Sequence, residues 1–232
     1  MKEDRVTGCL LEVIALTVAD ARAAERGGAD RVEVVSDMAA DGLTPAARLV
    51  ERMRSAVDLP LRVMLRDREG FTIDREGVAC LARTAKDLRA AGADEFVLGF
   101  LTADGRIDVE ATTALVEALG GARWTFHRAI DHAADQESAW SALHGLPGLD
   151  FVLTAGSAAG VPTGLPVLAD RAARPPTGVR LLAGGGLRTE HVPALRAMGV
   201  DAIHVGGLVR SGWDSPVCED RVRALRAHLE EQ

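Results

Sequence analysis

The sequence predicts one domain over residues 1–232, a (β/α)8 barrel of the TIM type. Eight short aliphatic runs recur at intervals of about 20 to 35 residues, and each suits a buried parallel strand. Between them lie segments whose apolar residues stand three and four positions apart, as on one face of a helix. Such alternation in a chain of this length favours a closed barrel over an open doubly wound sheet.

The expected strands follow one another along the whole chain. They begin near Cys9, Asp30, Leu59, Asp94, Ala122, Leu149, Val179 and Asp201. Four of them are preceded by the same joint, which is a glycine, one apolar residue and an aspartate. The glycines of these joints are Gly28, Gly92, Gly148 and Gly199. Because glycine at a helix end supplies a left-handed turn, we expect each joint to lead from a helix into a strand.

The expected helices have recognisable starts, with one exception. Thr44 followed by Pro45 is typical of an N-cap with proline at the first helical position. Arg188 or Thr189 opens a later helix in the same way, with an acid in its first turn. The exception is the segment 160–177, which glycine and proline interrupt. We expect an irregular or shortened sixth helix there.

The composition narrows the class of protein. With 27 Lys and Arg against 34 Asp and Glu, the formal charge is −7, which argues against a nucleic-acid partner or a membrane surface. No signal peptide and no 18-residue apolar run are found, so we expect a cytoplasmic protein without a membrane span. The widely spaced cysteines fit neither a disulfide framework nor a metal clamp. We expect Cys9, Cys80 and Cys218 to be structural thiols without a chemical role, and four histidines to be surface residues, namely His132, His144, His191 and His228.

The phase of the expected strands brings polar side chains into one lumen. Alternate residues of a barrel strand face inward, and a charge facing the helices would be buried without solvent. This phase turns inward Glu12, Glu33, Arg62, Arg66, His127 and His204. The C-terminal ends of the strands form the catalytic face of such barrels. There we expect Arg66, His127, Arg128, Asp131, Thr154 and His204, with Glu12 and Glu33 deeper.

Two interpretations of this lumen remain open. In the first, imidazoles and carboxylates perform acid–base work while arginines hold a substrate anion. In the second, Glu12 and Glu33 pair with Arg62 and Arg66 in a neutral network that only specifies the core.

Glycine clusters after the seventh and eighth strands add a second signal. Backbone N–H groups freed at such positions commonly cradle a phosphate in these barrels, although a run of glycines can also be only a tight turn. The expected anion-binding residues are Thr154, Gly156, Gly184, Gly185, Gly186, Gly206 and Gly207.

Several long polar motifs occur in order and resemble the CutC family, whose members are often called copper homeostasis proteins. The most specific are LTADGRID from Leu101 and TFHRAID from Thr125, accompanied by GGADRVEV, SDMAADGLTP and GGGLRTEHV. The resemblance implies a cytoplasmic TIM-type barrel that forms a homo-oligomer, a dimer or tetramer, with a role in copper handling. The polar residues that it carries over are Glu12, Glu33, Arg66, His127, Arg128, Asp131 and His204.

Several residues that differ from the family pattern stand at positions where a copper ligand would be expected. Ile14 and Val35 stand where members of the family carry cysteine, the soft ligand that Cu(I) prefers. Arg62 replaces a histidine, and Asp67 replaces a proline. Copper bound through His127 and His204 with a carboxylate is the remaining possibility.

Three hypotheses therefore follow. The first is a copper-binding homeostasis protein. The second is a lyase or isomerase acting on a small anionic or phosphorylated metabolite, with His127 as acid–base, Arg66 and Arg128 as anion clamps, and Glu12 or Glu33 as orienting carboxylates. The third is an oligomeric scaffold that binds no ligand.

Overall fold

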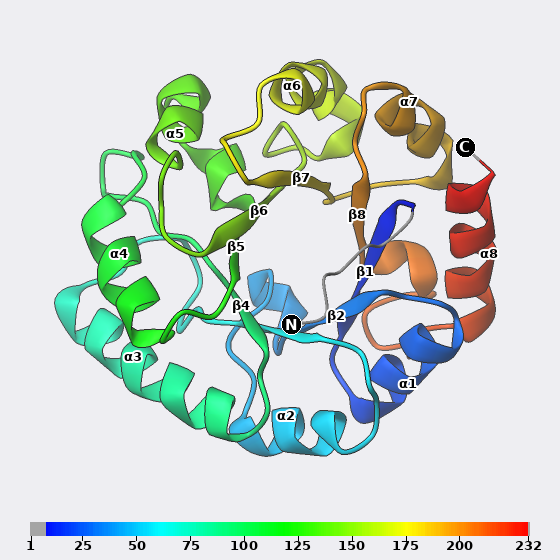
Figure 1. The fold of residues 1–232 in the computed structure, drawn as a ribbon, viewed down its shortest axis with the longest axis horizontal. Coiled ribbons are helices and arrows are strands. Elements are labelled where there is room, and N and C mark those ends of the chain that lie inside the picture. Colours follow the sequence, from blue (N-terminus) through cyan, green and yellow to red (C-terminus); the bar gives the residue numbers. More distant parts are fainter. Residues whose placement is uncertain (1–7, 232) are drawn as a thin grey trace.

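The computed structural model describes residues 8–231, and they form a closed barrel of eight parallel strands in chain order (Figure 1). This confirms the predicted fold class. The strands are β1 Leu10–Ala15, β2 Arg31–Val34, β3 Leu61–Met64, β4 Glu95–Leu98, β5 Trp124–Phe126, β6 Leu149–Thr154, β7 Arg180–Ala183 and β8 Ala202–Val205.

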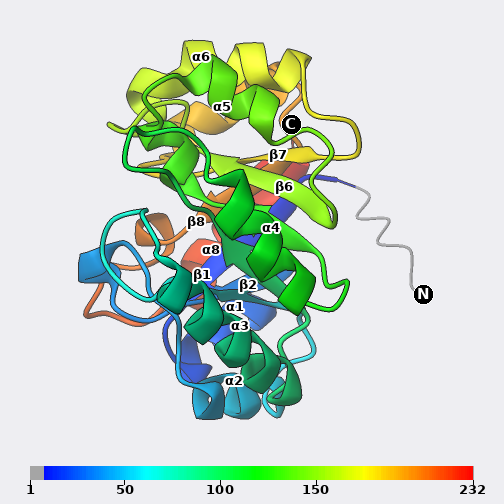
Figure 2. The same ribbon diagram turned by 90° about the vertical axis from the view of Figure 1, so that its left-hand side faces the viewer.

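A layer of helices surrounds the strands, and α8 lies beside α1 where the ring closes (Figures 1 and 2). The α-helices are α1 Val18–Arg26, α2 Ala47–Arg54, α3 Arg75–Ala90, α4 Val109–Ala118, α5 Gln136–Ala142, α6 Val161–Ala173, α7 Val192–Ala197 and α8 Glu219–Glu230. Four short 3-10 helices follow strands or open helices: η1 Met38–Ala40, η2 Arg128–His132, η3 Thr189–His191 and η4 Gly207–Val209. None of the described helices is long and apolar enough to cross a membrane.

The side chains of the strands alternate between two apolar environments. Outward residues such as Leu11 and Val13 pack under the helices in the large core. Inside the barrel the apolar residues form two smaller clusters. One contains Leu10, Phe151, Leu153, Leu182 and Ala202, and the other contains Ile14, Val35, Met64 and Val97. The polar lumen lies among these two clusters.

The four glycine joints have the predicted conformation. Their φ angles are +89° at Gly28, +102° at Gly92, +75° at Gly148 and +83° at Gly199. In two joints the aspartate also ties down the preceding strand. Asp30 accepts a hydrogen bond from the backbone N–H of Leu11 at 2.7 Å, and Asp94 accepts one from Leu61 at 2.9 Å.

The sixth helix is longer than the sequence indicated. Instead of a shortened element, α6 runs for 13 residues, with Pro162 in its first turn and Pro166 inside it. Gly164 lets the helix pack closely on the loop after β6, because a Cβ there would lie 1.8 Å from the backbone oxygen of Ala155. Pro162 therefore suits the start of the helix, and Gly164 allows its close packing, although both residue types usually disfavour a helix.

Thr44 is not the N-cap that we predicted. The helix α2 begins at Ala47, and its N-cap residue Ala46 makes no capping hydrogen bond through its side chain. The hydroxyl of Thr44 instead donates to the backbone oxygen of Arg66 at 2.9 Å and accepts from the Arg66 N–H at 2.8 Å. Tertiary pairing with the end of β3 has therefore replaced local capping.

The cysteines are free thiols, Cys9 buried and Cys80 and Cys218 exposed. Burial raises the pKa of Cys9 to about 11, which agrees with an unreactive thiol. His191 differs from the expectation of a surface residue, since only 7% of it is exposed. Its Nδ1 accepts a hydrogen bond from the backbone N–H of Arg188 at 3.1 Å, so it closes the turn that opens η3.

Candidate functional site

The C-terminal ends of the strands surround a pocket of about 530 Å³. The predicted site residues on its wall are Glu33, Arg66, His127, Arg128, Gly185, Gly186, His204, Gly206 and Gly207. Apolar side chains fill much of the remaining wall, among them Ile14, Val35, Met64, Phe71 and Trp213. The pocket therefore joins a few polar groups to a largely apolar surface, as small-molecule sites do.

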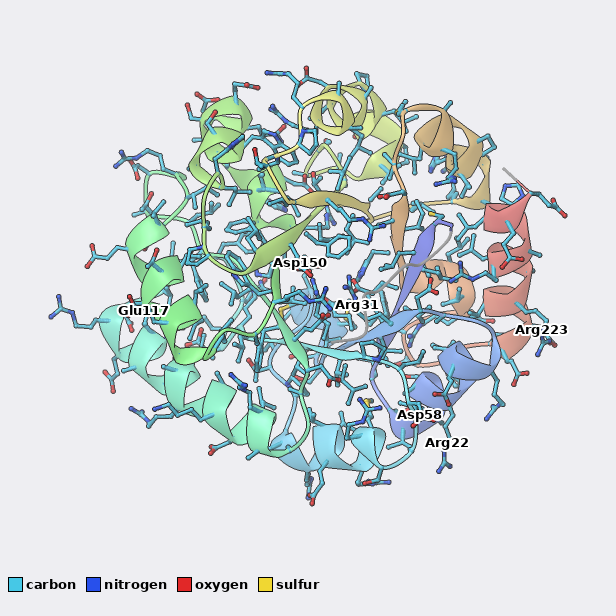
Figure 3. All side chains as sticks on the ribbon, viewed as in Figure 1. Arg22, Arg31, Asp58, Glu117, Asp150 and Arg223 are labelled. Atoms are coloured by element: carbon cyan, nitrogen blue, oxygen red, sulfur yellow. The ribbon has the colours of Figure 1, made fainter. Side chains whose placement is uncertain are left out.

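Below the pocket, the lumen holds buried ion pairs. Figure 3 shows Arg31 and Asp150 inside the ring of strands, whereas Arg223 points outward. Arg62 is fully buried and donates to Glu95 at 2.6 Å and to Asp150 at 2.7 Å. The predicted pairing of Arg62 with Glu12 or Glu33 is therefore wrong, because the adjacent strand β4 and the more distant strand β6 supply its carboxylates.

Four side chains of alternating charge type connect these buried ion pairs to the pocket, in the order Arg31, Glu12, His204 and Glu33. Arg31 donates through Nε to Glu12 at 2.5 Å. The other oxygen of Glu12 lies 2.7 Å from Nδ1 of His204, whose Nε2 lies 3.7 Å from Glu33. Burial works against the charged forms, but the two carboxylates raise the pKa of His204. Burial likewise opposes ionisation of Glu12, yet Arg31 and His204 hold the pKa of Glu12 well below its ordinary value.

Glu33 ends this chain at the pocket and is the unusual member. Burial, together with the nearby Glu12 charge, raises the pKa of Glu33 to about 7, despite the opposing effect of His204. Its Oε1 is buried and has no hydrogen-bond partner among the described residues. A carboxyl group that changes protonation near neutral pH suits general acid–base catalysis.

His127 presents a hydrogen-bond donor to the same pocket. Its Nδ1 accepts a hydrogen bond from the backbone N–H of Ala129 at 3.2 Å, so in the neutral ring the proton lies on Nε2. Burial, helped by the charge of Arg66, lowers the pKa of His127 to about 3. Nε2 is buried without a partner among the described residues. His127 is therefore a neutral donor that points to a missing acceptor.

Arg66 brings to the wall a positive charge that has no ion pair among the described residues, and Asp41 is the acid with the largest electrostatic effect on it. Its Nε donates to the backbone oxygen of Gly70 at 2.9 Å, and its Nη1 donates to Ala40 at 2.7 Å and to Gly42 at 3.1 Å. These bonds tie the loops after β2 and β3 together. Only 3% of Arg66 is exposed, and within the described chain Nη2 has no hydrogen bond and the guanidinium no ion pair.

Arg128 is held beside the pocket by other predicted residues. It pairs with Asp131 at 2.9 Å, and its Nη2 reaches two carbonyls of the loop after β6. Asp131 also accepts from the hydroxyl of Thr154 and from the N–H of Ala155 at 2.9 Å. Neither Asp131 nor Thr154 is on the pocket wall. Both residues position Arg128 and the loop, without facing a ligand.

The predicted anion-binding glycines divide into two groups. Gly185, Gly186, Gly206 and Gly207 are on the wall of the pocket. The other two are needed for close packing. A Cβ at Gly156 would lie 2.3 Å from the backbone oxygen of Gly164, and one at Gly184 would lie 2.9 Å from the side chain of His204.

Trp213 is a residue of the pocket that the sequence analysis missed. Its ring lies against Gly206, where a Cβ would come within 2.4 Å of the indole, and Arg210 lies 4.9 Å from its centroid. It is 41% exposed, whereas Trp124 and Trp140 are buried. No motif marks the segment after η4, so nothing in the sequence indicated that it folds back over the mouth.

The two positions at which the resemblance implies cysteine, Ile14 and Val35, are apolar here in structure as well as in sequence. Ile14 and Val35 pack with Met64 and Val97 inside the barrel. Among residues 8–231, no three side chains of His, Cys, Asp or Glu are placed so that they could hold a metal ion.

Comparisons with known proteins agree with this arrangement. The family model described as the CutC family matches residues 9–208. A Klebsiella pneumoniae protein named as a family protein CutC is 34% identical over 196 residues, 84% of this chain and 78% of the relative. The human protein named copper homeostasis protein cutC homolog is 33% identical over 217 residues, 92% of this chain and 78% of that protein.

Solved structures share the fold. CutC from Streptococcus agalactiae has a TM-score of 0.78 at 24% identity, covering 85% of this chain and 98% of that one. Thiamine phosphate pyrophosphorylase from Pyrococcus furiosus has a TM-score of 0.62 at 17% identity, covering 96% of each chain.

Proposed function

Since this chain belongs to the CutC family, we propose that the pocket of this member binds a small anionic metabolite and performs acid–base chemistry on it. The observation that carries the proposal is the state of Glu33. A buried carboxyl group with a pKa of about 7 and an unpartnered oxygen faces a pocket that also contains an unpaired guanidinium. Perturbed titration in a cleft is characteristic of functional sites.

The contacts favour particular roles. Glu33 is the group that takes and returns the proton, and His204 with Glu12 positions it. Arg66 attracts the anionic group of the ligand through its free Nη2, and Arg128 adds positive charge at the rim. The wall glycines at 185–186 and 206–207 leave space for that group between the last two loops. This differs from the hypothesis that made His127 the acid–base, because a histidine with a pKa of about 3 is a very weak base, and its Nδ1 lone pair already accepts the Ala129 N–H.

Native mass spectrometry of the purified protein tests the proposal directly. We expect a retained organic anion, or an anion whose binding changes the fluorescence of Trp213, the exposed tryptophan of the pocket.

Arg66→Met removes the guanidinium and is expected to weaken binding by about 10- to 100-fold, as loss of a charged hydrogen bond does. Arg106→Met, on an exposed loop pair with Asp104, serves as the matched control. Equal binding by both variants would contradict the proposal.

Copper as cargo is the second candidate, favoured by membership of a family that includes the human copper homeostasis protein cutC homolog. The two histidines expected to bind it are both engaged. Both ring nitrogens of His204 face carboxylates, and a protonated imidazole has no lone pair for a metal. The lone pair of neutral His127 is on Nδ1, which accepts the Ala129 N–H. We expect no stoichiometric Cu(I) binding under reducing conditions. Binding of one Cu(I) per chain that disappears in both His127→Ala and His204→Ala would establish this candidate instead.

A further inference from the structure

The wall of the pocket contains three polar groups that the protein itself leaves without a partner, and each is of a different kind. Nε2 of His127 is a neutral donor, Oε1 of Glu33 is an acceptor and potential base, and Nη2 of Arg66 carries positive charge. Oε1 of Glu33 and Nε2 of His127 are also buried, and buried polar groups are nearly always satisfied, so these two call for an explanation. Together the three groups describe a ligand that offers an oxygen acceptor, a proton and an anionic group.

The surroundings of Glu33 indicate what kind of proton it meets. Ile14, Val35 and Met64 are on the wall of the same pocket and pack with Val97 in an apolar cluster, while His204 is the polar neighbour of Glu33 at 3.7 Å. An apolar, poorly hydrated setting keeps the carboxylate basic enough to act on a weak carbon acid. A neutral histidine that donates to a carbonyl oxygen would stabilise the negative charge that forms there when the neighbouring carbon loses its proton.

Covalent catalysis through an amine, a thiol or a hydroxyl group has no residue on the described pocket wall. The described residues on the pocket wall include no Lys, Cys, Ser or Thr. Lys86, the lysine of the described chain, is exposed on α3. A Schiff base or an acyl intermediate therefore has no nucleophile at the pocket, and proton transfer is the chemistry that the wall supports.

We infer that this site removes and returns a proton on a carbon next to a carbonyl group, in a small substrate that also carries a carboxylate or phosphate. The inference rests on the proposed function. The carboxylate of Glu33 takes the proton, the C–H electron pair forms the C=C bond of an enolate, and the carbonyl π pair moves to oxygen. That oxygen accepts the Nε2–H hydrogen bond of His127. Glu33 then returns the proton to the same carbon as the carbonyl π bond re-forms, so the step needs no oxidant or reductant.

Exchange with deuterated water provides the test. The purified protein is incubated with its co-purified anion, and separately with dihydroxyacetone phosphate, hydroxypyruvate and 2-oxobutyrate, and the C–H signal beside the carbonyl is followed by proton NMR. The phosphate and carboxylate probes distinguish the two anionic groups. We expect at least one compound to exchange at least about 100-fold faster than in buffer, a rise typical of general base catalysis.

Three variants assign the roles. Glu33→Gln keeps the shape but removes the base and is expected to abolish the exchange. His127→Asn keeps an acceptor for the Ala129 N–H while removing the Nε2 donor, and is expected to slow exchange by about 100-fold. Glu117→Gln makes the same chemical change as the first variant on the exposed side of α4, away from the pocket wall, and is expected to leave exchange unchanged.

The possible outcomes separate the two proposals. A bound anion without exchange in any of the four compounds would overturn the inference and leave the anion site intact. Wild-type exchange in folded Glu33→Gln would also overturn it. If no anion is retained, no probe changes the Trp213 fluorescence and no exchange occurs, both the inference and the proposed function are wrong.

Discussion

At the scale of single residues, Glu33 links the electrostatics of the barrel to its stability. The native pKa of about 7 lies above the ordinary value of 4.5, so between these two pH values the folded state holds a proton that the unfolded chain has released. Stability therefore decreases as pH rises through this window. Protonation of His204, whose pKa is also raised, acts in the same direction.

We expect the free energy of unfolding of the wild type to fall between pH 5 and pH 8.5, and Glu33→Gln to remove up to about 3 kcal/mol of this fall. The reason is that glutamine does not titrate. Urea denaturation at several pH values measures the difference. Identical pH profiles for the two proteins would mean that Glu33 titrates as it does in water.

Glu12 lies deeper in the barrel than Glu33 and pairs with both Arg31 and His204. In Glu12→Gln, Arg31 and His204 both lose their closest carboxylate oxygen. We expect a loss of about 3 to 5 kcal/mol in stability, as when one partner of a buried pair is removed. We also expect a lower His204 pKa, which an NMR titration of its imidazole signals measures. An unchanged titration would show that Glu33 alone sets the charge of His204.

Strand alternation predicted much of this polar lumen, and its errors have identifiable causes. Glu12, Glu33, Arg62 and His204 are buried in the barrel as expected. Arg31, which the sequence analysis did not name, stands two residues before Glu33 and follows the same alternation. Thr154 was expected at the mouth because it ends β6, but Leu153 is the β6 residue on the wall and the Thr154 hydroxyl bonds Asp131. A single sequence does not reveal that tertiary partner.

At the scale of elements, α6 shows how tertiary contact overrides local signals. Its glycine and prolines individually disfavour a helix, yet Gly164 is what allows the helix to approach the strand end. The joints before even strands were predictable because their signal is local, a left-handed glycine followed by an aspartate. The entry to α2 was not, because the partner of Thr44 is Arg66, which lies 22 residues away just after β3.

Gly164→Ala is expected to cost at least about 3 kcal/mol, because the new methyl group meets backbone that cannot rotate away. Gly77→Ala on α3 is the matched helical control. Its methyl group would meet a flexible side chain, that of Ile73 at 2.8 Å, so we expect a change within about 1 kcal/mol. Thermal unfolding of both variants gives the comparison. Equal losses would indicate that α6 moves away from Ala155 at little cost.

At the scale of the whole molecule, the resemblance to CutC predicts a dimer or tetramer. Light scattering of the purified chain checks this, and we expect a mass of two or four chains that does not depend on the anion. A mass of one chain over a wide range of protein concentration would contradict the prediction. Trp213 and Val109, the large apolar side chains that are about two-fifths exposed in the described chain, are the positions to substitute in mapping the contact.

The joints before β2, β4, β6 and β8 have a further consequence for the ring as a whole. Each joins an odd strand and its helix to the following even strand, so the barrel consists of four β-α-β-α quarters with a similar hinge at the centre of each. A circular permutation that opens the chain between two quarters, for example after α4, would leave all four hinges intact. We therefore expect closure of the barrel not to depend on which quarter comes first in the chain.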